Sequence, residues 1–128
     1  MEVEAIWKKK YRVEVKARQF QIRTDEAPEY SGDDTGMMPT ELFLASLASC
    51  FCMALVFVAR KKKIEVKDMH VAVEGEKDLK NFKFSKLVVK VRSSTPPRSL
   101  EEMITAAKEY CFVSNTITNS CPIRYKVM

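Results

Sequence analysis

One segment limits the possible folds of this chain more than any other: residues 42–59 carry no charged side chain, whereas charges are frequent on both sides. Eighteen such residues make about five helical turns with apolar side chains on every face. A helix of this kind lies either at the centre of a globular fold or across a membrane. Two serines and two cysteines lower its hydrophobicity, and it is at the short limit for spanning. We therefore expect a buried central helix and no membrane partner.

The residues on both sides of this run alternate between apolar and polar side chains, as in half-buried antiparallel strands. Three short strands are predicted before Thr24, followed by a polar loop at 25–38. Two more strands are predicted at 66–74 and 82–91, with a polar turn between them. The apolar parity slips within the second of these, which predicts a bulge near Ser85.

A second helix is predicted at 99–111, where apolar residues recur at spacings of three and four. Ser99 and Glu102 fit a capping box at its start. Residues 124–128 can form a last strand. The predicted order is β-β-β-α-β-β-α-β, an α+β fold in one domain over residues 1–128.

Charge and the start of the sequence bear on partners and location. The net charge of +5 is mild, and basic residues are interleaved with acidic ones. The one dense basic cluster, residues 60–63, follows the uncharged run, where cations complement a helix C-terminus, so no nucleic-acid partner is expected. No apolar stretch precedes residue 42, which favours the cytoplasm and reduced thiols.

Four cysteines carry the most distinctive chemistry. Their spacing contains no two-residue knuckle, and residues 50 and 52 point to opposite sides of a helix, so no metal site is expected. Cys50 and Cys111 each fall on the core-facing side of a predicted helix. They are interpreted either as inert buried thiols or as a redox pair. Cys52 and Cys121 are interpreted as passive.

Two stretches resemble the OsmC/Ohr family. The first runs from Asp33 to Cys50 (DDTGMMPTELFLASLASC), and the second from Ala107 to Ile117 (AKEYCFVSNTI). Their separation and the order of predicted elements also fit this family. The resemblance covers essentially the whole chain.

The resemblance implies a thiol-dependent peroxidase that reduces organic hydroperoxides in oxidative stress defence, without a bound cofactor. Cys50 would be peroxidatic and Cys111 resolving, with a sulfenic acid and then a disulfide as intermediates. An external dithiol, for example of the lipoyl type, would restore the thiols. The family also implies an intertwined homodimer, with two central helices between sheets from both chains.

Some residues depart from the hydroperoxide-specific branch. In that branch a Glu directly after the motif proline helps to orient a catalytic arginine; this chain has Thr40 there, followed by Glu41, which is the candidate for that role. In this chain, Arg12 is nearest in sequence order to the family arginine that would stabilise the thiolate. Phe112 stands where the family often has proline. The alternatives are a non-enzymatic dimeric protein that binds an apolar ligand, or another cysteine-dependent transfer reaction on the same fold.

Overall fold

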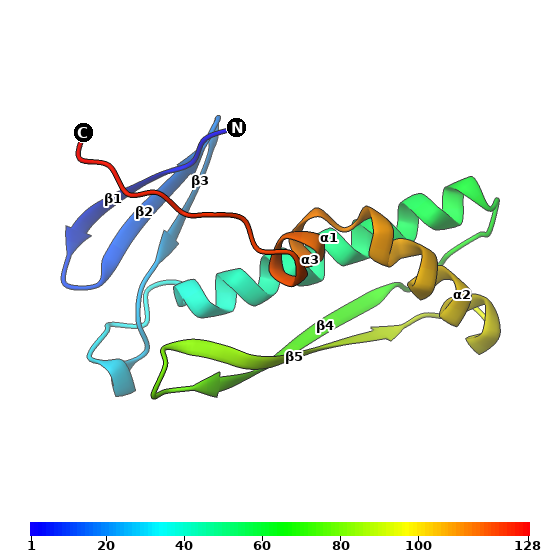
Figure 1. Ribbon diagram of the computed structural model, residues 1–128. Coiled ribbons are helices and arrows are strands. Elements are labelled where there is room, and N and C mark those ends of the chain that lie inside the picture. The colour runs from blue at the N-terminus through cyan, green and yellow to red at the C-terminus, as the bar shows by residue number, and fades with distance from the viewer. The chain divides into compact units, whose positions relative to one another are not determined.

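The computed structural model describes all residues from 1 to 128 and confirms an α+β architecture with two antiparallel sheets (Figure 1). The chain divides into two compact units, residues 1–43 and 44–128. The first unit holds one sheet and a long loop, and the second holds the hydrophobic core. Each unit is described by itself.

The first unit confirms the three predicted N-terminal strands. They form one antiparallel sheet in the order of the chain, and two-residue turns join them. Lys10 and Arg18 begin these turns with positive φ of 53° and 55°. The strands are β1 (Glu4–Lys9), β2 (Arg12–Ala17) and β3 (Phe20–Thr24).

The loop that follows β3 folds back closely on the end of that strand. It contains the short 3-10 helix η1 (Pro28–Tyr30), and the Asp25 N–H donates to the Met37 carbonyl at 3.2 Å. Glycine is required at position 32, because a Cβ there would lie 1.8 Å from the Glu26 carbonyl oxygen. The loop is therefore an ordered connection whose polar groups point at one another.

The uncharged run forms the long helix α1 (Pro39–Lys61), as predicted. Pro39 opens the helix, and the Glu41 carboxylate accepts a hydrogen bond from the Met38 N–H at 2.8 Å. Two cations, Arg60 and Lys61, occupy the last turn, where they complement the helix dipole. By length and composition alone α1 could cross a membrane, but the core helices of soluble proteins share these properties.

The second sheet is a single long hairpin of β4 (His70–Asp78) and β5 (Lys83–Arg92). It begins four residues later than predicted, at His70, which is exposed. The predicted bulge is confirmed: the register shifts between Glu76 and Lys77, which leaves Ser85 without a paired residue on β4.

Two predictions for the C-terminal third are wrong in detail. The helix α2 (Pro97–Ala107) begins at Pro97 and has no side-chain cap, because a proline already holds the helical φ of the first turn. It is followed by the 3-10 turn η2 (Lys108–Tyr110) and a third helix, α3 (Phe112–Thr118), which the sequence did not predict. Residues 120–128 form no strand, since a strand needs hydrogen bonds to a neighbouring backbone.

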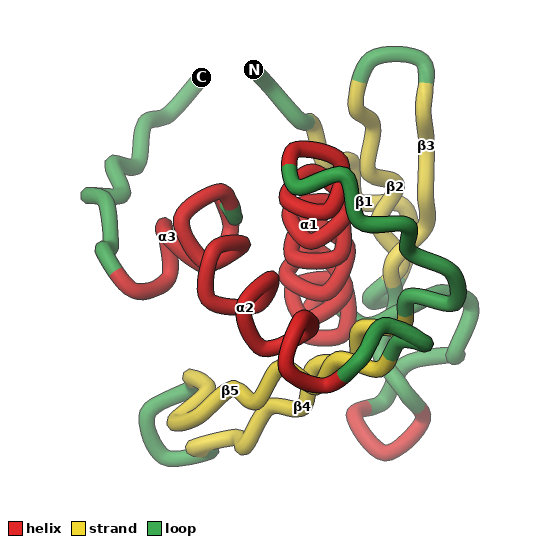
Figure 2. Tube along the Cα trace, turned by 90° about the vertical axis from the view of Figure 1, so that its right-hand side faces the viewer, coloured by secondary structure: helices red, strands yellow, loops and turns green.

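The core of the second unit lies between α1, α2 and the hairpin. Figure 2 shows α1 along its axis, with α2 and α3 beside it and β4 and β5 beneath. The core is built from one face of α1 together with three residues of the C-terminal third; its members are Leu47, Phe51, Ala54, Leu55, Val58, Ala59, Met103, Ala107 and Cys111. Another face of α1 is uncovered, with Met53 70% and Phe57 46% exposed.

Candidate functional site

Cys50 lies near the middle of α1, on the side that packs against the core. Its side chain is half-buried, and it contacts the cluster of fully buried residues. The helix fixes its backbone, because its neighbours Leu47 and Phe51 are buried on both sides of it in sequence. Cys50 therefore combines a rigid position with partial access to solvent.

Cys111 lies at the break between η2 and α3. Its backbone is extended, with φ −88° and ψ 101°, and its side chain is completely buried. The Ser114 N–H approaches the Cys111 sulfur at 3.5 Å, and the Ser114 hydroxyl donates to the Cys111 carbonyl at 3.2 Å. The thiol is thus the N-terminal cap of α3, and the helix breaks here although Phe112 replaces the family proline.

The structure places both predicted thiols in one apolar core. Cys111 is a member of the buried cluster, and Cys50 packs against that cluster. Neither cysteine is in a disulfide. Two reduced thiols that reach each other in a common core can supply two electrons and close a disulfide.

Arg12 belongs to the first unit, where two aspartates of the long loop face it. Its Nη2 donates to Asp33 Oδ2 at 2.8 Å, and its Nε lies 4.0 Å from Asp25 Oδ2. Lys10 also donates to Asp33, at 2.6 Å. The hydrogen bond from Lys10, helped by that from Arg12, lowers the pKa of Asp33. The Arg12 Nε–H is buried and has no hydrogen-bond acceptor.

Asp25 is the most deeply buried carboxylate of this cluster, with 1% of its surface exposed. It accepts hydrogen bonds from the Thr35 hydroxyl at 2.7 Å, the Thr35 N–H at 3.1 Å and the Glu26 N–H at 2.8 Å. The Thr35 hydroxyl, with these backbone donors, lowers the pKa of Asp25 to about 2 against the opposing effect of burial. Asp25 is therefore ionised and fixed beside Arg12.

The carboxylates of Asp33 and Glu41 bind different partners. The Asp33 carboxylate binds the cation of β2, Arg12, and that of the turn before it, Lys10. Glu41, a candidate for orienting the arginine, caps the first turn of α1 through Met38. Sequence reasoning missed Asp25 and the role of Asp33, because an aspartate in a polar loop gives no local sign of a distant partner.

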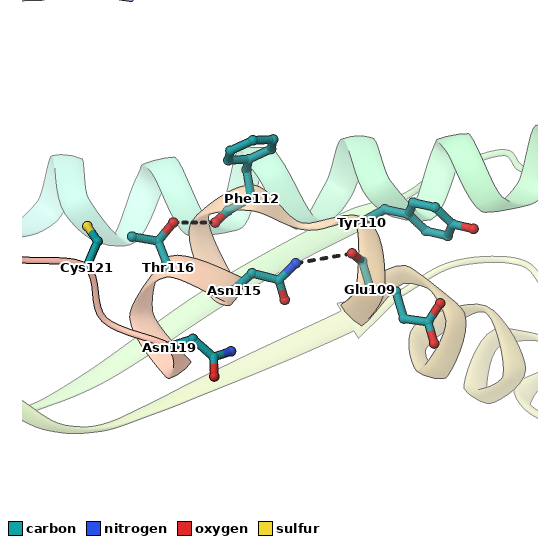
Figure 3. Close-up of a pocket in the computed structure, with 7 residues that line it drawn as sticks. All are labelled: Glu109, Tyr110, Phe112, Asn115, Thr116, Asn119 and Cys121. Carbon is teal, nitrogen blue, oxygen red and sulfur yellow. Dashed lines mark hydrogen bonds between the residues drawn. The ribbon is translucent and has the colours of Figure 1, made fainter.

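The two remaining cysteines border surface hollows. Cys121 lines a hollow of about 440 Å³ (Figure 3). Asn115 and Thr116 also line it; their side chains donate to the carbonyls of Glu109 and Phe112. Cys52 lines a second hollow of about 550 Å³ on the uncovered face of α1, beside Met53, Val56, Phe57, Arg60 and Lys61. Neither hollow is lined by Cys50 or Cys111.

The fold and the thiols define a class of protein: a small α+β domain with one cysteine on its central helix and one in the core at the start of α3. No group of three or more His, Cys, Asp or Glu side chains is placed to hold a metal ion. Residues 32–126 match the model of the OsmC-like protein family. The chain belongs to this family.

A curated relative and several solved structures are similar to the chain. An uncharacterized protein of Methanocaldococcus jannaschii is 30% identical over an alignment of 96 residues that covers 70% of this chain and 48% of that protein. The chain thus matches about half the length of that relative.

Among the solved structures, an OsmC-like protein of Mycoplasma pneumoniae superposes with a TM-score of 0.78 at 21% identity, covering 93% of this chain and 87% of the other. The organic hydroperoxide resistance protein OsmC of Legionella pneumophila gives 0.73 at 24% identity, covering 91% and 87%. An organic hydroperoxide resistance protein of Elizabethkingia anophelis superposes with a TM-score of 0.71 at 21% identity, covering 92% of this chain and 87% of the other. These likenesses establish the fold.

Proposed function

We propose that this chain is a thiol-dependent peroxidase that reduces organic hydroperoxides. The observation that carries the proposal is the pair of reduced thiols, Cys50 and Cys111, in one apolar core of an OsmC-like fold. The hydroperoxide resistance proteins among its structural neighbours support the same class of reaction. An apolar setting suits a substrate with an organic group.

The reaction proceeds in three steps. The Cys50 thiolate attacks one peroxide oxygen; the O–O bond breaks, the departing oxygen takes a proton and leaves as an alcohol, and Cys50 becomes a sulfenic acid. The Cys111 thiol then attacks the Cys50 sulfur, forming a disulfide and releasing water. An external dithiol reduces this disulfide by exchange and is itself oxidised to a disulfide.

Burial suits the assignment of the two roles. Peroxide must reach the attacking sulfur, and Cys50 is the more exposed of the two. Cys111 is completely buried, so its thiol is shielded from peroxide and from solvent thiols. By its resemblance to the family, we propose Arg12 as the residue that stabilises the Cys50 thiolate.

The working unit is proposed to be a homodimer. The uncovered face of α1 exposes Met53, Val56 and Phe57, and a soluble protein normally covers such a patch. The C-terminal segment also carries Ile123, Tyr125 and Val127, which alternate as in a strand and are each at least 75% exposed. A second copy can cover the helix and pair with this segment.

Substitution of Cys50 tests the enzymatic proposal. Cys50→Ser is expected to abolish peroxide consumption with a dithiol reductant and to leave the fold intact, because oxygen and sulfur differ little in volume. The matched controls are Cys52→Ser and Cys121→Ser, which are expected to keep most of the activity. Wild-type turnover by Cys50→Ser would refute the proposal and favour a binding protein with inert thiols.

A further inference from the structure

The tip of the β4–β5 hairpin exposes two large apolar side chains. The turn at 79–82 joins Asp78 to Lys83, and in it Leu79 is 72% and Phe82 95% exposed. Neither residue contributes to the hydrophobic core. The fold therefore has no evident packing use for a phenylalanine or a leucine at these positions.

The conformation of Phe82 makes this choice of residue more unusual. Its φ is +51°, in the left-handed region that glycine and asparagine adopt readily and that is strained for a bulky side chain. The Asp78 carboxylate fixes the turn by accepting from the N–H groups of Lys80 and Asn81, both at 3.2 Å, and from Asn81 Nδ2 at 2.7 Å. The turn thus holds the ring outward at a conformational cost.

The side chains around the tip are basic. Residues 77–86 contain four lysines and one aspartate. Lys80 and Lys83 are exposed and form no ion pair, and Lys86 is only loosely paired with Glu76, at 3.6 Å. The chain as a whole carries a net charge of +5. A rigid apolar tip surrounded by cations matches the chemistry of an anionic bilayer surface, where rings enter the interface and ammonium groups remain at the phosphates.

We propose that the β4–β5 tip docks this protein onto anionic phospholipid membranes, with Phe82 and Leu79 inserted at the interface and Lys80 and Lys83 at the headgroups. This interaction is peripheral. The expectation of no membrane partner was argued from the sequence only against a helix that spans the bilayer. It does not depend on the thiol chemistry, so its test stands whether or not the protein is a peroxidase.

Vesicle flotation tests the proposal with the full-length protein. Wild type is expected to float with vesicles of phosphatidylcholine and phosphatidylserine, but not with phosphatidylcholine alone, and binding should weaken as salt is raised. Phe82→Asn should lower the partition coefficient about tenfold, the magnitude of one buried aromatic side chain. The same variant should melt a few degrees higher, because asparagine tolerates a positive φ.

Charge and environment are tested separately. Lys80→Gln/Lys83→Gln should bind anionic vesicles less than Lys9→Gln/Lys16→Gln, which removes the same charge from the other sheet. In a Trp7→Phe background, the emission of Phe82→Trp should shift to the blue on adding anionic vesicles. The proposal is overturned by absent wild-type binding, by equal binding of Phe82→Asn, or by equal loss in both lysine pairs. A changed oligomeric state in Phe82→Asn would assign the tip to a contact between copies and also overturn it.

Discussion

At the scale of single residues, the two thiols differ in what can reach them. Cys50 is half-buried on a rigid helix, whereas Cys111 is completely enclosed and held by Ser114 at the start of α3. Such an arrangement favours internal disulfide formation over attack by outside thiols, because only a group within the core can approach the Cys111 sulfur. In the proposed reaction, this difference in access makes Cys50 the first thiol to be oxidised.

The proposed resolving role of Cys111 predicts the products of oxidation. One equivalent of an organic hydroperoxide should yield a Cys50–Cys111 disulfide, detected by peptide mapping under non-reducing conditions. In Cys111→Ser the sulfenic acid of Cys50 should accumulate and, with more peroxide, over-oxidise, since no thiol in the core can condense with it. Mapping that joins Cys50 to Cys52 or Cys121 instead would reject Cys111 as the resolving residue.

Asp33 is predicted to position Arg12. Asp33→Asn removes the carboxylate that accepts from Arg12 Nη2 and should lower turnover about tenfold, the magnitude of a hydrogen bond to a charged group. The rate of Cys50 alkylation at neutral pH should fall with it, which a loss of stability alone would not produce. Asp34→Asn is the matched control, because the Asp34 carboxylate has no partner; equal effects of both variants would remove Asp33 from the mechanism.

At the scale of elements, the loop between β3 and α1 is organised by one buried carboxylate. Asp25 ties the loop to Thr35 and to the Glu26 backbone beside Arg12. Gly32 and Gly36 permit the close approach of backbone segments that these bonds require. The loop therefore connects the start of α1 to the sheet through polar contacts in place of an apolar core.

The low pKa of Asp25 predicts how stability depends on pH. Because the folded pKa, about 2, lies below the ordinary value of 3.8, Asp25 stabilises the fold above about pH 4, and this contribution is lost as the pH falls towards 2. Asp25→Asn should be less stable than wild type at pH 7, and the difference should shrink between pH 4 and 2. Urea unfolding at several pH values measures this; a constant difference would contradict the prediction.

At the scale of the whole molecule, the apolar surface exceeds what one chain covers. The exposed residues include Met53, Val56 and Phe57 on α1, and Val3, Trp7 and Phe20 in the N-terminal region. Burial of apolar area stabilises an assembly by about 25 cal/mol per Å². A two-fold contact that includes α1 would remove an aggregation risk and bring a second chain near the surface beside Cys52.

Met53→Glu is predicted to weaken the homodimer. A carboxylate on the uncovered face of α1 would be desolvated in the contact, so the variant should dissociate at concentrations where the wild type is expected to be dimeric. Its unfolding midpoint should also be lower than that of the wild type at the same protein concentration. Light scattering over the micromolar range measures this. Lys16→Glu, which places a carboxylate on β2, is the control. A wild-type protein that is folded and active as a monomer would contradict the proposed dimer.

The sequence by itself determined the elements whose signals are local. The uncharged run at 42–59 predicted the central helix, alternation predicted the five strands, and the parity slip located the bulge at Ser85. Helical spacing predicted most of α2, and two motifs identified the family. These features are readable because residues close in the chain set them through backbone periods of 3.6 and 2.

Only the tertiary structure decided the features that depend on distant residues. It broke the last helix at Cys111, whose burial in the core fixes an extended backbone there. It brought Asp25 and Asp33 to Arg12 across the loop, which no local pattern announces. It also left residues 120–128 without a strand, because the apolar alternation of Ile123, Tyr125 and Val127 specifies a strand only where another backbone supplies its hydrogen bonds.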